Sequence, residues 1–297
     1  MKKPITIFNL MATILVVAMI VLLVLSFGRT SNTREYISIS KQLENNKLSV
    51  VIKGKGGYQE NCLTFDLKNL TRDSLFVKLE PGRRIVCEDS SYQDIFIVKE
   101  KIVILPPLAS VTTDGYGFCC RASKGSPAKN SKFNIGYMAP PAWIELAEVI
   151  NQNNFPINAI QNSIWVLSDN HSIASIHHEK MEEIDLLRKT VAKIKGIVLP
   201  WYTITYEKDT AMLFSERPEK LFGKINFYTN KNAIISINIR SPKGRLMTTL
   251  VEEERKDQGN HEYKLNLDIK GWPKGDYDIC VYEDFSNLNF KKRFTIE

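Results

Sequence analysis

The stretch "AIQNSIWVLSDN" at residues 159–170 places an uncharged amide and an indole inside an apolar run, at a spacing that could bring them together. Gln161 and Trp165 are four residues apart, so a helix would bring the carboxamide and the indole onto one face. The chain also carries cysteines, whose thiolate form is nucleophilic; they are Cys62, Cys87, Cys119, Cys120 and Cys280. Two interpretations of Gln161 are therefore open: it is a packed helix residue, or its amide is a reactant.

The segment Ile160-Gln-Asn-Ser-Ile-Trp165 resembles the glutamine motif of bacterial thioester domains, and Gly117-Phe-Cys-Cys-Arg121 is similar to their cysteine motif. The resemblance implies that the Cys119 sulfur attacks the Gln161 carboxamide, that ammonia leaves, and that a strained Cys–Gln thioester remains. A nucleophile on a partner surface, such as a lysine amine, would then displace the sulfur and form a covalent bond. Trp165 and Phe118 would form the apolar wall that keeps water away.

Such a reaction has three physical requirements. The thiol must lose its proton, the carboxamide carbon must lie roughly 3–3.5 Å from the sulfur, and a donor must stabilise the developing oxyanion. No residue stands out as that donor. In the competing interpretation, a buried Trp165 packs on the neighbouring β domain and Gln161 forms a hydrogen bond with the backbone.

The pairing of the cysteines stays open. An odd number leaves at least one thiol unpaired. A vicinal Cys119–Cys120 disulfide would be strained, so two thiols, or one bond each to Cys62 and Cys87, are favoured.

Metal and cofactor sites have little support in the sequence. CxxC pairs are missing, which argues against structural zinc. His178 and Glu182 could share a helix face, but they supply only two ligands, and a solvated helix start explains the same residues. We therefore expect neither a metal nor another cofactor.

Other catalytic patterns are also missing from the sequence. The stretch Gly54-Lys-Gly-Gly57 lacks the spacing of a phosphate-binding loop and indicates a turn. There is no G-x-S-x-G motif, and with only four histidines a serine hydrolase is hard to assemble. We expect a protein that is not an enzyme.

The elements that must position Cys119 and Gln161 form a predicted domain over residues 48–197. Short β-type runs, separated by turn signals, predict an antiparallel β-sandwich; they lie at 48–54, 62–68, 74–80, 84–88, 94–98, 101–105 and 109–120. An appended three-helix subdomain follows, with helices at 142–151, after Pro156, and at 179–195, where Gly196 ends the last.

A second β domain is predicted over residues 198–297. Alternating runs with glycine-rich turns between them predict an immunoglobulin-like (Ig-like) sandwich; they lie at 224–228, 234–240, 245–252, 261–269 and 276–283. Its pattern "SPKGRLMTTL…GNHEYKLNL…KGWPKGDYDICVY" resembles the modules of flagellar-hook capping proteins and the ends of exported bacterial proteins. A related module is a secretion-sorting signal in some surface proteins.

The amino-terminal residues 1–28 predict a signal-anchor or a signal peptide, followed by a polar linker at 29–47. Residues 5–27 carry no charge and are long enough, as a helix, to span the hydrocarbon of a membrane. Lys2 and Lys3 precede this span, which predicts a cytoplasmic amino terminus with the soluble part outside. Cleavage near Ser26-Phe-Gly28 and release from the membrane is the alternative.

The whole chain therefore predicts a mainly β protein of the cell envelope. Its net charge of +7 is diffuse and forms no basic stripe, so we expect no nucleic-acid partner. The leading hypothesis is a non-enzymatic binding or adhesion module whose partner is a surface protein or a glycan. The alternatives are covalent adhesion through Cys119 and Gln161, and a secreted protein whose terminal module is a sorting signal.

Overall fold

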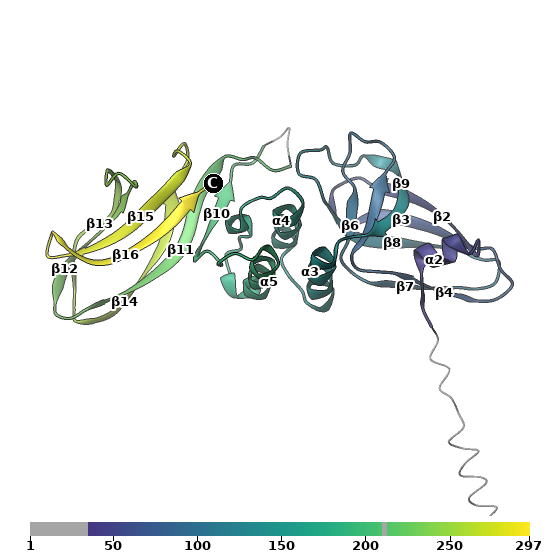
Figure 1. The fold of residues 1–297 in the computed structure, drawn as a ribbon, viewed down its shortest axis with the longest axis horizontal. Helices are drawn as coiled ribbons and strands as arrows, with labels where there is room; N and C mark the ends of the chain where they lie inside the picture. The colour runs from purple at the N-terminus through teal and green to yellow at the C-terminus, as the bar shows by residue number, and fades with distance from the viewer. Residues whose placement is uncertain (1–34, 210–212) are drawn as a thin grey trace, which may run out of the picture. The chain divides into compact units, whose positions relative to one another are not determined.

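The computed structural model describes residues 35–209 and 213–297, and the compact unit Ile37–Glu297 contains the elements discussed below. The unit is mainly β, as predicted, with its three longest helices grouped in the middle of the sequence (Figure 1). The predicted membrane segment 5–27 lies outside the described residues. Among those that are described, no helix is long and apolar enough to cross a membrane.

The first β domain contains a closed barrel, where a two-sheet sandwich was expected. The barrel order is β2-β3-β8-β6-β5-β9. Its strands are β2 (Leu48–Lys55), β3 (Gln59–Asn69), β5 (Arg83–Cys87), β6 (Ile95–Ile97), β8 (Ser110–Cys119) and β9 (Lys129–Met138). Strand β9, which the sequence did not predict, pairs with both β2 and β5 and so closes the sheet. Its residues are mainly polar and only Phe133 is fully buried, which hides the alternation.

A three-stranded sheet shares its hydrophobic core with the barrel. It consists of β1 (Ile37–Ser38), β4 (Leu75–Leu79) and β7 (Lys101–Leu105). Helix α2 (Ile39–Glu44) follows β1 directly and buries Ile39 and Gln42. The folded unit therefore begins inside the predicted linker 29–47, ten residues or so before the first predicted strand.

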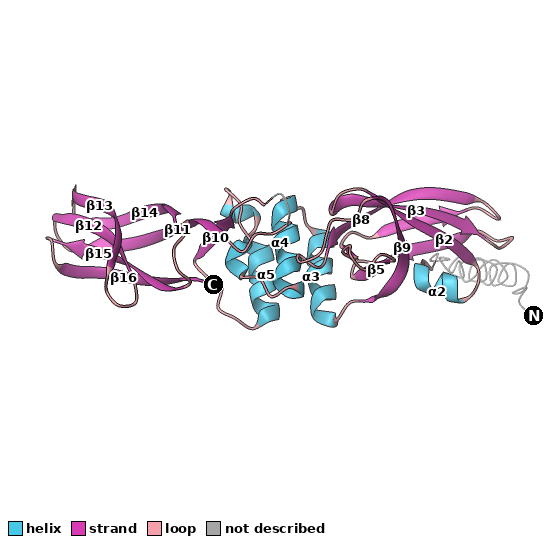
Figure 2. Ribbon diagram, turned by 90° about the horizontal axis from the view of Figure 1, so that it is seen from above, coloured by secondary structure: helices cyan, strands magenta, loops and turns pink. Residues whose placement is uncertain are grey.

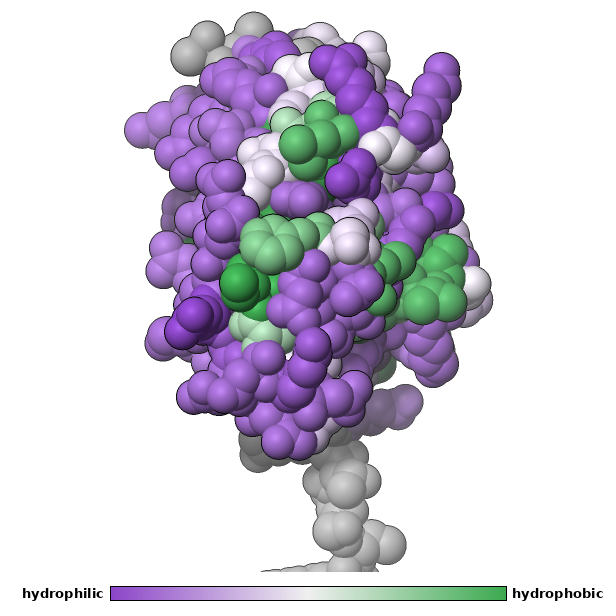
Figure 3. Space-filling model, turned by 90° about the vertical axis from the view of Figure 1, so that its left-hand side faces the viewer, coloured by the Kyte–Doolittle hydropathy of each residue, from purple (hydrophilic) through white to green (hydrophobic). Residues whose placement is uncertain are grey.

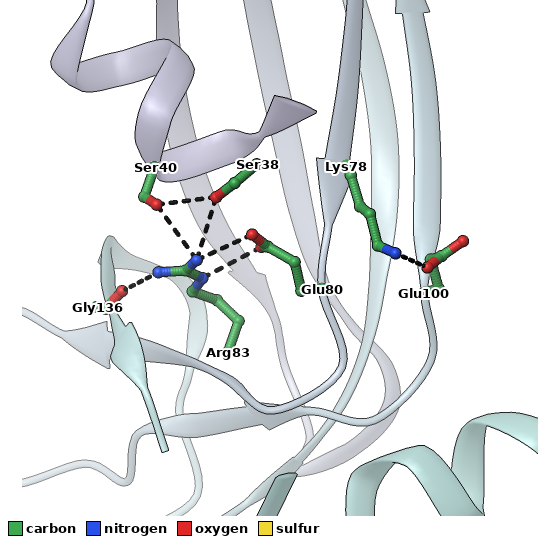
Figure 4. A network of polar contacts seen from close by, with 7 residues as sticks. All are labelled: Ser38, Ser40, Lys78, Glu80, Arg83, Glu100 and Gly136. Carbon is green, nitrogen blue, oxygen red and sulfur yellow. Dashed lines mark hydrogen bonds and ion pairs between the residues drawn. The ribbon is translucent and has the colours of Figure 1, made fainter. Parts of the chain in front are cut away.

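Arg83 connects β1 and α2 to the barrel through its hydrogen bonds (Figure 4). Its side chain is only 6% exposed and forms an ion pair of 3.0 Å with Glu80. The guanidinium also donates to the hydroxyls of Ser38 and Ser40, at 3.3 and 3.2 Å, and to the carbonyl of Gly136 at 3.0 Å. One buried cation thus joins β1, α2 and β9, which are distant in sequence.

The predicted helical region contains three helices. It comprises α3 (Pro141–Gln152), α4 (Ile157–Ser168), the 3-10 turns η1 (Ile173–Ser175) and η2 (Met181–Glu183), and α5 (Asp185–Lys195). Figure 2 shows α3, α4 and α5 side by side, and their apolar faces share one core with Phe96, Phe118 and Cys120 of the barrel. The third helix begins later than predicted, because η2 precedes it. Gly196 ends it at a φ of 65°, a conformation that favours glycine.

The second β domain is the predicted sandwich. One sheet contains β10 (Tyr202–Tyr206), β11 (Pro218–Thr229) and β14 (Gly259–Asp268); the other contains β13 (Leu246–Lys256), β12 (Ala233–Arg240), β15 (Gly275–Glu283) and β16 (Asn287–Ile296). The two sheets share a core of alternating apolar residues. Strands β10 and β16 were not predicted from the sequence.

The helical subdomain and the second β domain are linked by a buried arginine. Arg188 of α5 donates to the carbonyls of Pro200 and Tyr202, each at 2.9 Å. Burial lowers the pKa of Arg188 to about 10, which leaves it charged at neutral pH. This contact sets where β10 begins relative to α5.

Candidate functional site

The cysteine motif lies at the end of β8, where successive side chains face different cores. Cys119 packs inside the barrel core with Cys62 and Cys87, whereas Phe118 and Cys120 pack in the core that includes the helices. Burial raises the pKa of the Cys119 thiol far above its ordinary value, and that of Cys120 to about 12. All five cysteines belong to the described residues, and there each is a free, buried thiol.

Gln161 and Cys119 are brought together across 42 residues of sequence, through the backbone of Cys119. The Gln161 side-chain amide donates to the Cys119 carbonyl oxygen at 2.8 Å, in a buried position. Trp165 is only 3% exposed, and its ring stacks on Tyr58 of the barrel, with centroids 6.3 Å apart. The packing interpretation of these two helix residues therefore describes the geometry of the structure.

Helix α4 presents a second, polar face beside its apolar one. Ile160 and Ile164 pack in the helical core, while Asn158, Gln161/Asn162 and Trp165 recur at the spacing of one helical stripe. This stripe lines a cavity of about 580 Å³, within the range of roughly 300–1,000 Å³ that is usual for small-molecule sites. The sequence motif was thus found, but the two asparagines on the same stripe were missed, although their spacing was visible.

The rest of the cavity comes from segments far from α4 in sequence. Tyr58 and Gln59, at the start of β3, form one wall. They precede a β-bulge at which Glu60 has a φ of 64°, and bulges commonly re-aim side chains next to functional sites. The described lining is completed by Ser175 of η1, His177, residues 204–209 and 213–215, and Glu219 of β11.

Aromatic rings form much of the cavity wall. Trp165 meets Phe214 edge to face at 5.9 Å, and Phe214 in turn lies 4.7 Å from Tyr206. His171, which is outside the lining, stacks on Phe214 with centroids 3.9 Å apart. The sequence pattern gives no sign of this cluster, because its members come from α4, the turn that follows α4, β10 and the loop that follows β10.

Buried polar atoms without a hydrogen-bond partner in the described structure gather at this cavity. Nine such side-chain atoms occur among all the described residues, and four of the nine belong to residues of the cavity lining. They are Oε1 of Gln59, Oε1 of Gln161, Nε1 of Trp165 and Oγ of Ser175. Leaving a buried polar group unpaired costs about 1–3 kcal/mol, so such a concentration indicates a site whose partners come from outside the chain.

Two of the three acidic side chains of the lining, Glu207 and Asp209, are paired with basic residues. Glu207 accepts from Arg217 at 2.7 Å and pairs with Lys270 at 2.6 Å; hydrogen bonds from these two cations hold the pKa of Glu207 below its usual value. Arg217 also contacts Asp209 at 3.1 Å. The other two charged residues of the described lining, Lys208 and Glu219, carry opposite charges, so no single charge sign dominates the cavity.

A second cavity, of about 650 Å³, lies beside His177, Trp201 and Phe222. Its lining is more apolar, and none of the unpaired buried atoms of the described residues belongs to it. His178 lies 3.7 Å from Glu183 rather than beside Glu182. Within the described part of the chain, no cluster of three or more metal-ligating side chains occurs.

The exterior of the second β domain gives a weaker functional signal. The face drawn in Figure 3 is mainly hydrophilic, and its hydrophobic side chains form small, separate patches. Scattered apolar side chains of this kind are ordinary on protein surfaces. The cavity beside α4 is therefore the best-defined candidate site.

Comparison with known proteins does not assign the chain to a family. No family model matches the sequence, and a search of curated proteins found no significant match.

Proposed function

We propose that the protein is a non-enzymatic binding module of the cell envelope, and that the cavity beside α4 holds its ligand. The observation that supports this proposal is the set of unpaired buried polar atoms on an aromatic-walled cavity. A cavity that combines apolar walls with a few convergent polar groups is the usual form of a binding site. The proposed partner is a surface protein or a glycan.

The proposed location is outside the cytoplasmic membrane. It rests on the uncharged segment 5–27 and the lysines before it. A fusion of alkaline phosphatase after Glu297 tests it, because that enzyme becomes active only where its disulfides form. We expect an active fusion, and an inactive fusion at normal protein level would contradict the location.

Blocking the cavity tests the binding function. Asn158 is exposed at the cavity lining, so Asn158→Trp should obstruct the cavity without disturbing a core. We expect the full-length wild-type chain to be retained on purified envelope material, and the variant to lose that retention. The matched control is Asn154→Trp, an exposed position outside the lining. Equal retention of all three proteins would count against the cavity.

A covalent mode of binding is the second candidate, favoured by the contact between Gln161 and Cys119. In that reaction a bond forms between Cys119 sulfur and the Gln161 side-chain carbon, the carbon–nitrogen bond breaks, and the amide nitrogen leaves as ammonia with the thiol proton. The buried, protonated thiol and its position in the barrel core oppose this reaction.

Intact-mass spectrometry separates the two binding modes. A thioester makes the chain lighter by one ammonia and adds methylamine on treatment, whereas the non-covalent mode leaves the mass at its sequence value. The alternative role of residues 198–297 as a sorting signal predicts a mature secreted product from which that domain has been removed.

A further inference from the structure

We infer that the cavity beside α4 recognises a neutral saccharide; this inference rests on the proposed binding function. The first argument is the hydrogen-bonding character of the unpaired atoms. The carbonyl oxygens of Gln59 and Gln161 are acceptors, and the Trp165 indole nitrogen is a donor. A hydroxyl both donates and accepts, so neighbouring hydroxyls on one ligand satisfy both kinds of group.

The charge of the lining disfavours ionic ligands. An anion would meet the two carbonyl oxygens and three carboxylates, against the one ammonium of Lys208 in the described lining; the carboxylates are those of Glu207, Asp209 and Glu219. A cation would meet the Trp165 donor and Lys208, while two of the three carboxylates are already paired with Arg217. Burying an unpaired charge is expensive, so a neutral ligand fits the cavity best.

The aromatic rings supply the apolar part of the recognition. Trp165, Tyr206 and Phe214 line the cavity together with the amides of α4. A sugar ring carries C–H groups on its faces and hydroxyls around its edge, and therefore has the same division into apolar and polar surfaces. Trp and Tyr suit such ligands because each joins a large apolar ring to one polar group.

A peptide ligand fits less well. The usual way to hold an extended peptide is to pair it with an open strand edge, and β10 is the edge strand next to the cavity. That edge is already occupied in part, because η1 packs against β10 and Arg188 donates to the carbonyl of Tyr202. The saccharide is therefore the ligand class that the cavity supports.

Calorimetric titration of the full-length chain tests the inference. The protein is kept in a detergent without a sugar headgroup and titrated with N,N′-diacetylchitobiose, cellobiose and maltose at up to millimolar concentration. We expect at least one disaccharide to bind. Trp165→Phe keeps an aromatic ring but removes the indole donor, and should weaken that binding roughly tenfold.

Two controls make the result interpretable. Trp143→Phe is the same substitution on α3, where the ring packs against Phe96 and lies outside the lining, so it should leave the affinity unchanged. Thermal unfolding of each variant checks that it is folded. Failure of all three sugars to bind, or binding that Trp165→Phe does not weaken, would overturn the inference.

A peptide arm separates this inference from the proposed function. Acetyl-tetra-alanine amide is neutral and offers only backbone groups. One outcome is that this peptide binds, that Trp165→Phe weakens the binding, and that none of the sugars binds. In that case the cavity is a binding site for peptides and the saccharide inference is wrong. If the blocking variant Asn158→Trp also has no effect on envelope retention, the proposed function falls as well.

Discussion

The side-chain nitrogen and oxygen of Gln161 have different roles. Its amide nitrogen holds α4 against β8 through the Cys119 carbonyl, while its oxygen remains buried without a partner among the described residues. The first interaction positions the helix stripe, and the second leaves an acceptor for a ligand. One side chain thereby connects the packing of α4 with the chemistry of the cavity.

The first prediction concerns the structural half of Gln161. Gln161→Leu removes the hydrogen bond to the Cys119 carbonyl and should lower the free energy of unfolding by about 1 kcal/mol. Chemical denaturation measures this change. Gln152→Leu, at the exposed end of α3, is the matched control and should change stability by less than about 0.5 kcal/mol. Equal stabilities of the two variants would show that the hydrogen bond contributes nothing.

The second prediction concerns the thiols. Burial raises the pKa of Cys62 and of Cys120 to about 12, and that of Cys119 further. Because the thiolate is the reactive form, the native protein should react only slowly with a thiol reagent at pH 8. After denaturation without reductant, all five cysteines should react. Rapid native labelling, or fewer than five reactive thiols after denaturation, would contradict the structure.

At the scale of elements, the corner formed by β1 and α2 depends on one buried ion pair. Arg83→Met leaves Glu80 without its partner and frees three neighbouring acceptors, so it should destabilise the protein by about 3 kcal/mol. The pair between Lys78 and Glu100, also drawn in Figure 4, is much more exposed. Lys78→Met is therefore the control and should cost about 0–1 kcal/mol. Similar losses in the two variants would refute the anchoring role of Arg83.

The sequence predicted those helices and strands that bury one face and expose the other, because their apolar residues recur at regular intervals. The three helices and most strands were found because apolar residues recur at a period of 3.6 or 2. Strands β9 and β16 were missed because polar residues dominate them: lysines and asparagines occupy β9, and the run Lys291-Lys-Arg293 lies inside β16. Barrel closure was missed with β9, because closure is a property of long-range pairing that local alternation does not encode.

At the scale of the whole molecule, the candidate site is assembled from three regions of the chain. The α4 stripe was accessible from sequence spacing, whereas Tyr58, Tyr206 and Phe214 come from elsewhere in the fold. No local pattern could predict that these rings meet, since their proximity depends on how the barrel, the helices and the second β domain pack. Conversely, the predicted thiol and carboxamide do lie in one region, but the contact runs through the backbone.

The pH dependence of stability involves contacts between different regions of the molecule. Two histidines that follow α4 in the sequence contact residues of the second β domain. His171 stacks on Phe214, and His177 stacks on Phe222 and bonds Thr203 at 2.8 Å. Burial lowers the pKa of both rings in the folded protein. The unfolded chain therefore binds protons more readily, and stability that is present above about pH 6.5 is lost as the pH falls through the lowered values.

Denaturation midpoints measured between neutral pH and pH 5 check this fourth prediction. The double variant His171→Phe, His177→Asn should lose less stability on acidification than the wild type. The matched control is His178→Asn, because the His178 ring is more exposed and contacts Lys180 and Glu183; this variant should follow the wild type. Parallel pH profiles for wild type and double variant would exclude the two rings as the cause.

The central claim is that the protein binds its partner in the cavity beside α4, without forming a covalent bond. Hydrogen–deuterium exchange of the full-length chain, with and without the retained envelope material, tests this claim most directly. We predict added protection in α4, at the start of β3 and in residues 204–207, at an unchanged intact mass. Protection confined to the outer strands of the second β domain, or a mass showing the loss of ammonia, would contradict it.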